Sequence, residues 1–110
     1  MVRLVKGDVV VIPFPFSDLS VVKRRPAFVV QKLPGDDVIL CQITSRKFRD
    51  RYSLLIDNSD FARGGLNRVS FVRPGRIFTA DMDIVDYRIG TLKVEITEKV
   101  IRRIIDIIKA

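Results

Sequence analysis

The chain of 110 residues contains no histidine. The ordinary pKa of histidine lies near neutral pH, and general acid–base catalysis uses its imidazole more often than any other side chain. Its absence excludes a Ser-His-Asp triad, a Cys-His pair and the two-histidine mechanism of common ribonucleases. Any catalysis by this chain must use other groups, and arginines beside hydroxyl groups are the candidates that remain.

Cysteine is nearly absent too, because Cys41 is the one cysteine of the chain. A single cysteine excludes an internal disulfide and a cysteine metal cluster. The aspartates at Asp36-Asp37 and within Asp81–Asp86 lack calcium-loop spacing, and Gly64-Gly65 is no phosphate-binding loop, so we expect no metal and no cofactor. No apolar run approaches the ~20 residues of a membrane span, and no signal-peptide pattern is present. We therefore expect a cytoplasmic protein that does not bind membranes.

Positive charge is concentrated in the middle of the sequence. Residues 23–76 contain twelve basic and five acidic residues, whereas the rest of the chain contains eight of each. The net charge of +7 thus belongs to this middle segment. A concentrated positive field suits a polyanion such as a nucleic acid, because binding to phosphates releases counterions. An ordinary solvated basic surface is the alternative, and charge by itself does not separate the two.

Most of the chain has the pattern of short β-strands. Alternating or continuous apolar runs bounded by turn residues predict strands at 8–13, 27–32, 38–44, 53–56, 68–72, 76–80 and 87–92. Loops are expected at 14–23, 45–52 and 57–65. Within 38–44, Ile39, Cys41 and Ile43 share one face, which we expect to be the core face, while Gln42 and Thr44 lie on the other.

The last segment changes to helical spacing. Thr97 is a candidate N-cap, with Ile96 and Ile101 as a hydrophobic staple. One apolar face then comprises Val100, Ile101, Ile104, Ile105 and Ile108. Many short strands followed by one amphipathic helix predict a mainly β protein, a small barrel with the C-terminal helix packed on it. The length and the lack of internal repeats predict a single domain over residues 1–110.

Several blocks of this sequence together resemble the MazF/PemK family of toxins. Gly7-Asp8-Val9-Val10 opens the first strand, a loop with Phe14–Leu19 follows, and Lys23–Val30 contains an Arg-Pro pair that opens the second strand. Later blocks agree in the same order: Ile43-Thr44-Ser45, Ser70–Arg73, Ile77–Asp81 and Ile89–Leu92. The resemblance covers nearly the whole chain.

The resemblance implies a small Src-homology-3-like barrel of the MazF/PemK/CcdB type that forms a homodimer. It implies a toxin of a type II toxin–antitoxin system, acting as a metal-independent endoribonuclease. Such an enzyme cuts single-stranded RNA at selected sequences and leaves a 2′,3′-cyclic phosphate. It further implies a cognate antitoxin whose acidic, flexible tail occupies the RNA groove, which agrees with the basic middle segment.

Two residues match the catalytic positions of the family. Arg25 matches the arginine before proline, and Thr44 the hydroxyl residue paired with it. A guanidinium binds phosphate in a bidentate manner and stabilises charge on a phosphorane. Arg73 resembles an arginine of plasmid-type members, but Gly75 stands where those have aspartate. With no histidine in the chain, we expect Arg73 to contact RNA, together with Lys23, Arg24, Arg46, Lys47, Arg49 and Arg51.

Other interpretations stay open at this point. Barrels of the CcdB type poison DNA gyrase by contact, without cutting. The helix here ends in isoleucine and lysine with no aromatic tail, and Arg25-Pro26 opens a strand; both features favour the nuclease. A degenerate toxin that binds RNA or antitoxin without cutting is a third possibility. Gly7 and Asp8 are expected to be structural, as a turn glycine and a carboxylate that holds backbone.

Overall fold

The computed structural model describes residues 3–15, 22–46 and 50–110. Within these ranges the β-branched and aromatic runs form one antiparallel sheet of seven strands in the order β4-β6-β3-β2-β1-β7-β5. The strands are β1 (Asp8–Pro15), β2 (Val22–Lys32), β3 (Asp37–Thr44), β4 (Leu54–Ile56), β5 (Phe61–Gly64), β6 (Ser70–Asp81) and β7 (Tyr87–Leu92). Two 3-10 turns, Asn58–Asp60 and Met82–Ile84, and one helix, α1 (Val94–Lys109), complete these elements.

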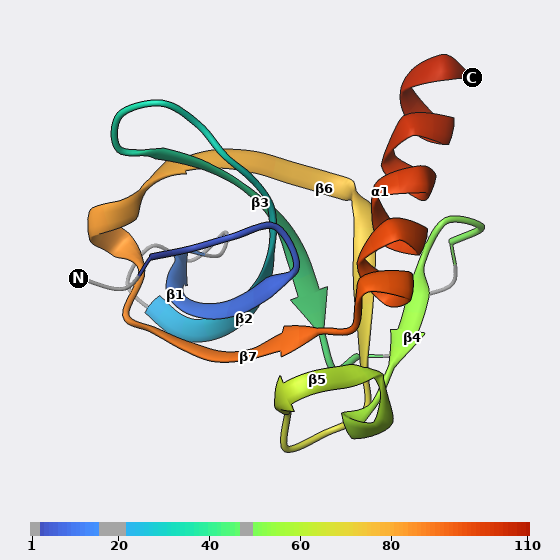
Figure 1. Cartoon of the computed structure of the whole chain (residues 1–110), viewed down its shortest axis with the longest axis horizontal. Helices are drawn as coiled ribbons and strands as arrows, with labels where there is room; N and C mark the ends of the chain where they lie inside the picture. Colours follow the sequence, from blue (N-terminus) through green and yellow to red (C-terminus); the bar gives the residue numbers. More distant parts are fainter. Residues whose placement is uncertain (1–2, 16–21, 47–49) are drawn as a thin grey trace.

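The sheet curls strongly, so that β1, β2, β3, β6 and β7 enclose one side of it, while α1 stands against the other side next to β6 (Figure 1). This arrangement confirms the prediction of a mainly β, barrel-like fold with a C-terminal helix. In the described part of the chain, no helix is long and apolar enough to cross a membrane.

Both faces of the central strands are buried. On the helix side, Val9, Phe28 and Cys41 pack with Val100 and Ile104 of α1. On the enclosed side a second apolar cluster comprises Leu4, Val10, Ile12, Ala27, Val29, Val38 and Leu40. The expectation of a single core face for 38–44 is therefore wrong, because the curl of the sheet also covers the face that carries Val38 and Leu40.

Several element boundaries differ from the prediction. Strand β1 extends to Pro15 and β2 begins at Val22, so both reach into the expected loop 14–23. Strands expected at 68–72 and 76–80 form one strand, β6, because β3 pairs on both sides of Pro74-Gly75 through Ile43–Val72 and Cys41–Ile77. The expected loop 57–65 contains β5, which pairs with β7. Helix α1 begins at Val94 rather than after Thr97. Thr97 is buried inside the helix and faces Gly7, so it is not the N-cap.

Gly7 and Asp8 hold the start of β1, as expected. Gly7 has a φ of 96°, and a Cβ there would lie 2.6 Å from the Thr97 hydroxyl. Asp8 is fully buried; its carboxylate accepts hydrogen bonds from the Val5 amide at 2.9 Å and the Thr91 hydroxyl at 2.8 Å. The Arg88 guanidinium lies 3.4 Å from the same carboxylate and neutralises it.

Candidate functional site

The register of the central strands sets several polar side chains on one face of the sheet. Ala27 of β2 pairs with Gln42 of β3, and continuing this register by two residues sets Arg25 opposite Thr44. Directly opposite residues in an antiparallel pair project to the same face, with Cβ atoms about 4.5–5.5 Å apart. Arg25 and Thr44, both half-buried, are thus cross-strand neighbours on the enclosed side of the sheet.

Arg73 of β6 joins these two residues from the other side of β3. Its guanidinium donates a hydrogen bond of 3.1 Å to the Gln42 side-chain oxygen. Since β3 lies between β2 and β6, and neighbouring strands are about 4.8 Å apart, Arg25 and Arg73 flank a central row that contains Gln42 and Thr44. We call Arg25, Gln42, Thr44 and Arg73 the arginine strip.

The electrostatics of the strip are dominated by its two guanidiniums. Burial and then the nearby charge of Arg76 lower the pKa of Arg73, while Asp50 acts in the opposite direction. The Thr44 hydroxyl oxygen accepts a hydrogen bond of 3.2 Å from the Arg46 amide, so its own proton can point outward to a ligand. The arrangement presents positive charge and hydroxyl or amide donors across a space of about 10 Å, two strand spacings. A phosphodiester is an anion that such donors bind and polarise.

The other predicted RNA contacts fall in different places. Lys23 and Arg46 are exposed at its border. Arg51 is exposed, and its guanidinium lies 5.3 Å from the centre of the Tyr52 ring. Arg24 precedes Arg25 on β2, so its side chain projects to the opposite face of the sheet, where it pairs with Asp86 at 2.6 Å. Lys47 and Arg49 lie outside the described residues.

Gln42 is a site residue that the sequence motifs did not single out, although the alternation of its strand indicated its position. The alternation of β3 already set it on the face of Thr44. Its contact with Arg73 depends on the bulge in β6 that the pairing with β3 requires, and no local pattern predicts that bulge.

Cys41 lies directly behind the strip and its thiol donates a hydrogen bond of 3.0 Å to the Arg73 carbonyl. Burial raises the pKa of this thiol to about 12. In an unfolded chain a thiol ionises near pH ~8.5. Between these two values the unfolded chain has lost the thiol proton and the folded chain retains it, so a rise in pH favours unfolding.

We therefore expect the free energy of unfolding to fall above pH ~8.5 by up to about 1.4 kcal/mol per pH unit from this one group. Urea denaturation of the wild type and Cys41→Ala between pH 7 and pH 10 measures it. The variant is less stable at every pH but has the shallower decline. Parallel curves for the two proteins would contradict a titrating buried thiol.

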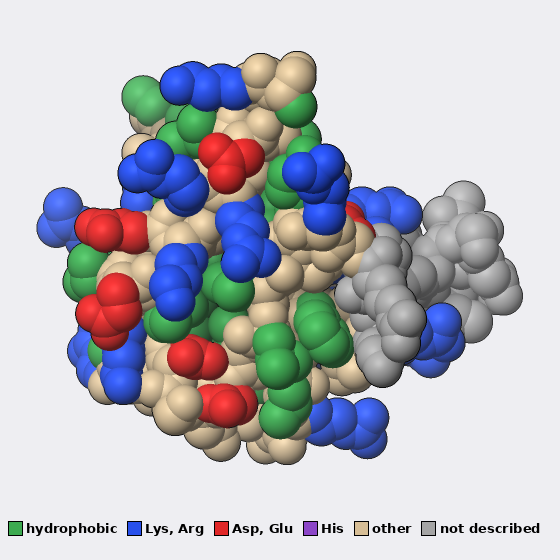
Figure 2. Space-filling model, turned by 90° about the vertical axis from the view of Figure 1, so that its right-hand side faces the viewer, with side chains coloured by type: hydrophobic (Ala, Val, Ile, Leu, Met, Phe, Trp, Pro, Cys, Tyr) green, Lys and Arg blue, Asp and Glu red, His purple; other side chains and the backbone are tan. Residues whose placement is uncertain are grey.

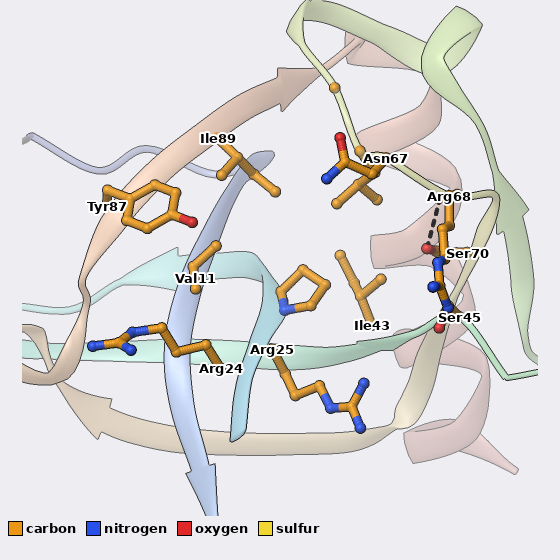
Figure 3. Close-up of a pocket in the computed structure, with 13 residues that line it drawn as sticks. Val11, Arg24, Arg25, Ile43, Ser45, Asn67, Arg68, Ser70, Tyr87 and Ile89 are labelled. Atoms are coloured by element: carbon orange, nitrogen blue, oxygen red, sulfur yellow. Dashed lines mark hydrogen bonds between the residues drawn. The ribbon is translucent and has the colours of Figure 1, made fainter. Parts of the chain in front are cut away.

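A cleft of about 510 Å³ opens on the opposite face of the same strands. Val11, Pro26 and Ile43 form its apolar floor. Tyr87 and Asn67 stand on its two sides (Figure 3). Arg25 also lines the cleft, and in this view its guanidinium extends away from the centre. Among the described residues no three histidine, cysteine, aspartate or glutamate side chains are grouped to hold a metal ion.

Comparison with solved structures identifies the fold. An endoribonuclease from a mycobacterial species, in complex with its cognate antitoxin, matches with a TM-score of 0.77 and 14% identity, over 97% of this chain and 96% of that chain. MazF from Deinococcus radiodurans matches with a TM-score of 0.77 and 15% identity over 100% of both chains. A chain in a MazE–MazF complex of that organism matches with a TM-score of 0.73 and 13% identity, over 98% of this chain and 97% of that chain. This fold is that of the MazF toxins.

The sequence itself agrees with this class. A profile of the PemK-like, MazF-like toxins of type II toxin–antitoxin systems matches residues 5–108. The chain therefore belongs to this family. A comparison with curated protein sequences finds no match.

Proposed function

We propose that the protein is a metal-independent endoribonuclease that cuts single-stranded RNA at selected sequences, as the toxin of a type II toxin–antitoxin system. The observation that carries the proposal is the register that sets Arg25 opposite Thr44, with Arg73 across β3. Family membership and the endoribonuclease named in a structurally similar complex support it. Because messenger RNA is translated in the cytoplasm, we also propose a cytoplasmic location.

The proposed reaction is an attack of the RNA 2′-hydroxyl oxygen on the adjacent phosphorus. The O2′–P bond forms, the P–O5′ bond breaks, and the products are a 2′,3′-cyclic phosphate and a 5′-hydroxyl. The 2′-hydroxyl proton passes to water and the leaving oxygen takes a proton from water, since no histidine is available. Arg25 binds the phosphorane oxygens, Thr44 donates a hydrogen bond to them, and Arg73 holds the phosphate from the far side.

Two partners follow from the proposal. The first is a cognate antitoxin with an acidic, flexible tail, because such a tail neutralises the same cationic strip that binds RNA.

The second partner is another copy of the chain. Strand β4 ends one edge of the sheet, and Leu55 of β4 and Val94 and Ile108 of α1 are exposed. Figure 2 shows hydrophobic side chains between basic ones on the side of the molecule that carries these elements. We propose that this apolar surface contributes to a homodimer.

Cleavage of a long single-stranded RNA in the presence of EDTA tests the proposal, with the cut ends mapped by sequencing. We expect cuts at a short recurring sequence, and the same RNA in double-stranded form to resist. Addition of magnesium should not change the rate. A folded, antitoxin-free protein that leaves the RNA intact would overturn the nuclease, and a gyrase inhibition assay would then test the CcdB-like alternative.

A further inference from the structure

The cleft behind the arginine strip is built from one continuous row of side chains. Tyr87 of β7 pairs with Val11 of β1, and Val11 pairs with Pro26 of β2. Continuing the β2–β3 register sets Ile43 next to Pro26. The row is apolar except for the Tyr87 hydroxyl, and directly opposite residues share a face. It forms a shallow floor bounded by an aromatic ring, and its volume of about 510 Å³ lies in the ~300–1,000 Å³ range of small-ligand sites.

The far side of the cleft is polar and held in place by hydrogen bonds. The segment 65–68 crosses it, and the Asn67 side chain points into the cleft toward Ile89 (Figure 3). This segment is fixed because Asn58 accepts a hydrogen bond of 2.9 Å from the Leu66 amide. The Gly65 amide also donates to the Ile89 carbonyl at 3.3 Å. A fixed segment loses little conformational freedom when a ligand binds.

Positive charge lines the rim of the cleft. Arg24 and Arg68 both border it, and their side chains are exposed. Arg24 is oriented by Asp86, and this hydrogen bond raises its pKa. An apolar floor with an aromatic wall suits the face of a base, an amide offers both a donor and an acceptor to its edge, and arginines suit the neighbouring phosphates.

The cleft and the arginine strip meet at one place in the sheet. Arg24 and Arg25 are consecutive on β2, and Thr44 and Ser45 are consecutive at the end of β3. Because side chains alternate along a strand, Thr44 projects to the strip while Arg24 and Ser45 border the cleft. Arg25 belongs to the strip and also lines the cleft, so the two share this residue. A strand of RNA on the strip therefore has the cleft next to it.

We propose that this cleft binds one unpaired nucleotide of the RNA, adjacent to the cut. Tyr87 stacks on its base, Asn67 reads the edge of that base, and Arg68 contacts its phosphate. The proposal rests on the proposed function for the identity of the RNA. An acidic peptide would satisfy the rim arginines but would make no use of the aromatic wall or the base-reading amide, so the cleft favours RNA.

Measurement of RNA binding tests the proposed role of the cleft separately from cleavage. A single-stranded oligoribonucleotide with 2′-O-methyl groups, which cannot be cut, is titrated with each variant and followed by fluorescence anisotropy. We expect Tyr87→Ala to weaken binding by roughly tenfold, within the range of base–aromatic stacking, and Tyr87→Phe to bind within about twofold of wild type. Tyr87 is 52% exposed, so neither change should disturb the fold.

The charge contribution has its own matched control. Arg68→Ala and Arg102→Ala each remove one exposed arginine, but Arg102 lies on α1, away from the cleft. We expect Arg68→Ala to reduce the slope of log affinity against log salt by about 0.7, the value for one phosphate contact on a single strand, and Arg102→Ala to leave it unchanged.

Sequencing of cut ends from a random single-stranded RNA pool tests the reading of the base. We expect Asn67→Ala to lose the base preference at one position beside the cut and to retain the others. Folded Tyr87→Ala and Asn67→Ala proteins that bind and cut as the wild type does would overturn the proposal that the cleft binds a nucleotide. Impaired binding of an acidic antitoxin peptide alone, with RNA binding intact, would also overturn it. A wild type that binds RNA through Tyr87 but never cuts would contradict only the proposed nuclease.

Discussion

Arg25→Ala is expected to reduce the rate of RNA cleavage by about 10²–10³-fold, the usual cost of removing one donor to a developing oxyanion. Arg25 is expected to act mainly in the transition state, so the loss should fall on kcat more than on KM. Arg25→Lys keeps the charge but not the planar fork, and should recover only part of the rate. Single-turnover cleavage of a mapped substrate measures both variants.

Arg102→Ala serves as the control for charge in this experiment, because it removes an exposed arginine of α1. It should cut at the wild-type rate, and all three variants should keep the wild-type circular dichroism spectrum. An Arg25→Ala protein that cuts as fast as Arg102→Ala would remove Arg25 from the mechanism.

Asp8→Ala is expected to destabilise the fold by about 2–4 kcal/mol, because each donor left without its buried acceptor costs roughly 1–3 kcal/mol. The carboxylate is fully buried, and its loss deprives the Val5 amide, the Thr91 hydroxyl and the Arg88 guanidinium of their common acceptor. Because these groups join the start of β1 to β7, the whole sheet loses stability. Urea denaturation at neutral pH measures the change.

Thr91→Val is the matched comparison for Asp8→Ala, since it removes one hydrogen bond of 2.8 Å and leaves the ion pair. It should cost about 1 kcal/mol, the net contribution of a typical hydrogen bond. Equal and small losses for the two variants would mean that the Asp8 network does not stabilise the start of β1.

The strands were predictable because their apolar alternation is strong. The sequence alone indicated β1, β2, β3 and β7 and the terminal helix. Its pattern could not show that the sheet curls far enough to bury Val38 and Leu40 as well as Cys41, because curvature arises from bulges and long-range pairing. The Pro74-Gly75 pair is typical of a turn, yet β6 continues to pair with β3 beyond it. The sequence pattern predicts Thr97 as an N-cap, but in the structure Thr97 lies inside the helix and is buried against Gly7.

The candidate site was predictable in part. The resemblance to MazF/PemK toxins directed attention to Arg25 and Thr44, and the strand register sets these two opposite one another. The position of Gln42 against Arg73 and the cleft beside Tyr87 depend on which strands are neighbours, which a single sequence does not encode locally. Arg24 illustrates the same limit: it is adjacent to Arg25 in sequence but projects to the other face and pairs with Asp86.

The most direct test of the central claim compares two RNAs in the presence of EDTA. One is an all-ribose strand that contains a mapped cut site, and the other carries a single 2′-deoxy nucleotide on the 5′ side of the scissile phosphate. The account predicts that the first is cut to a 2′,3′-cyclic phosphate and that the second remains intact at that site. Cleavage of the 2′-deoxy strand there, or loss of all cleavage in EDTA, would contradict it.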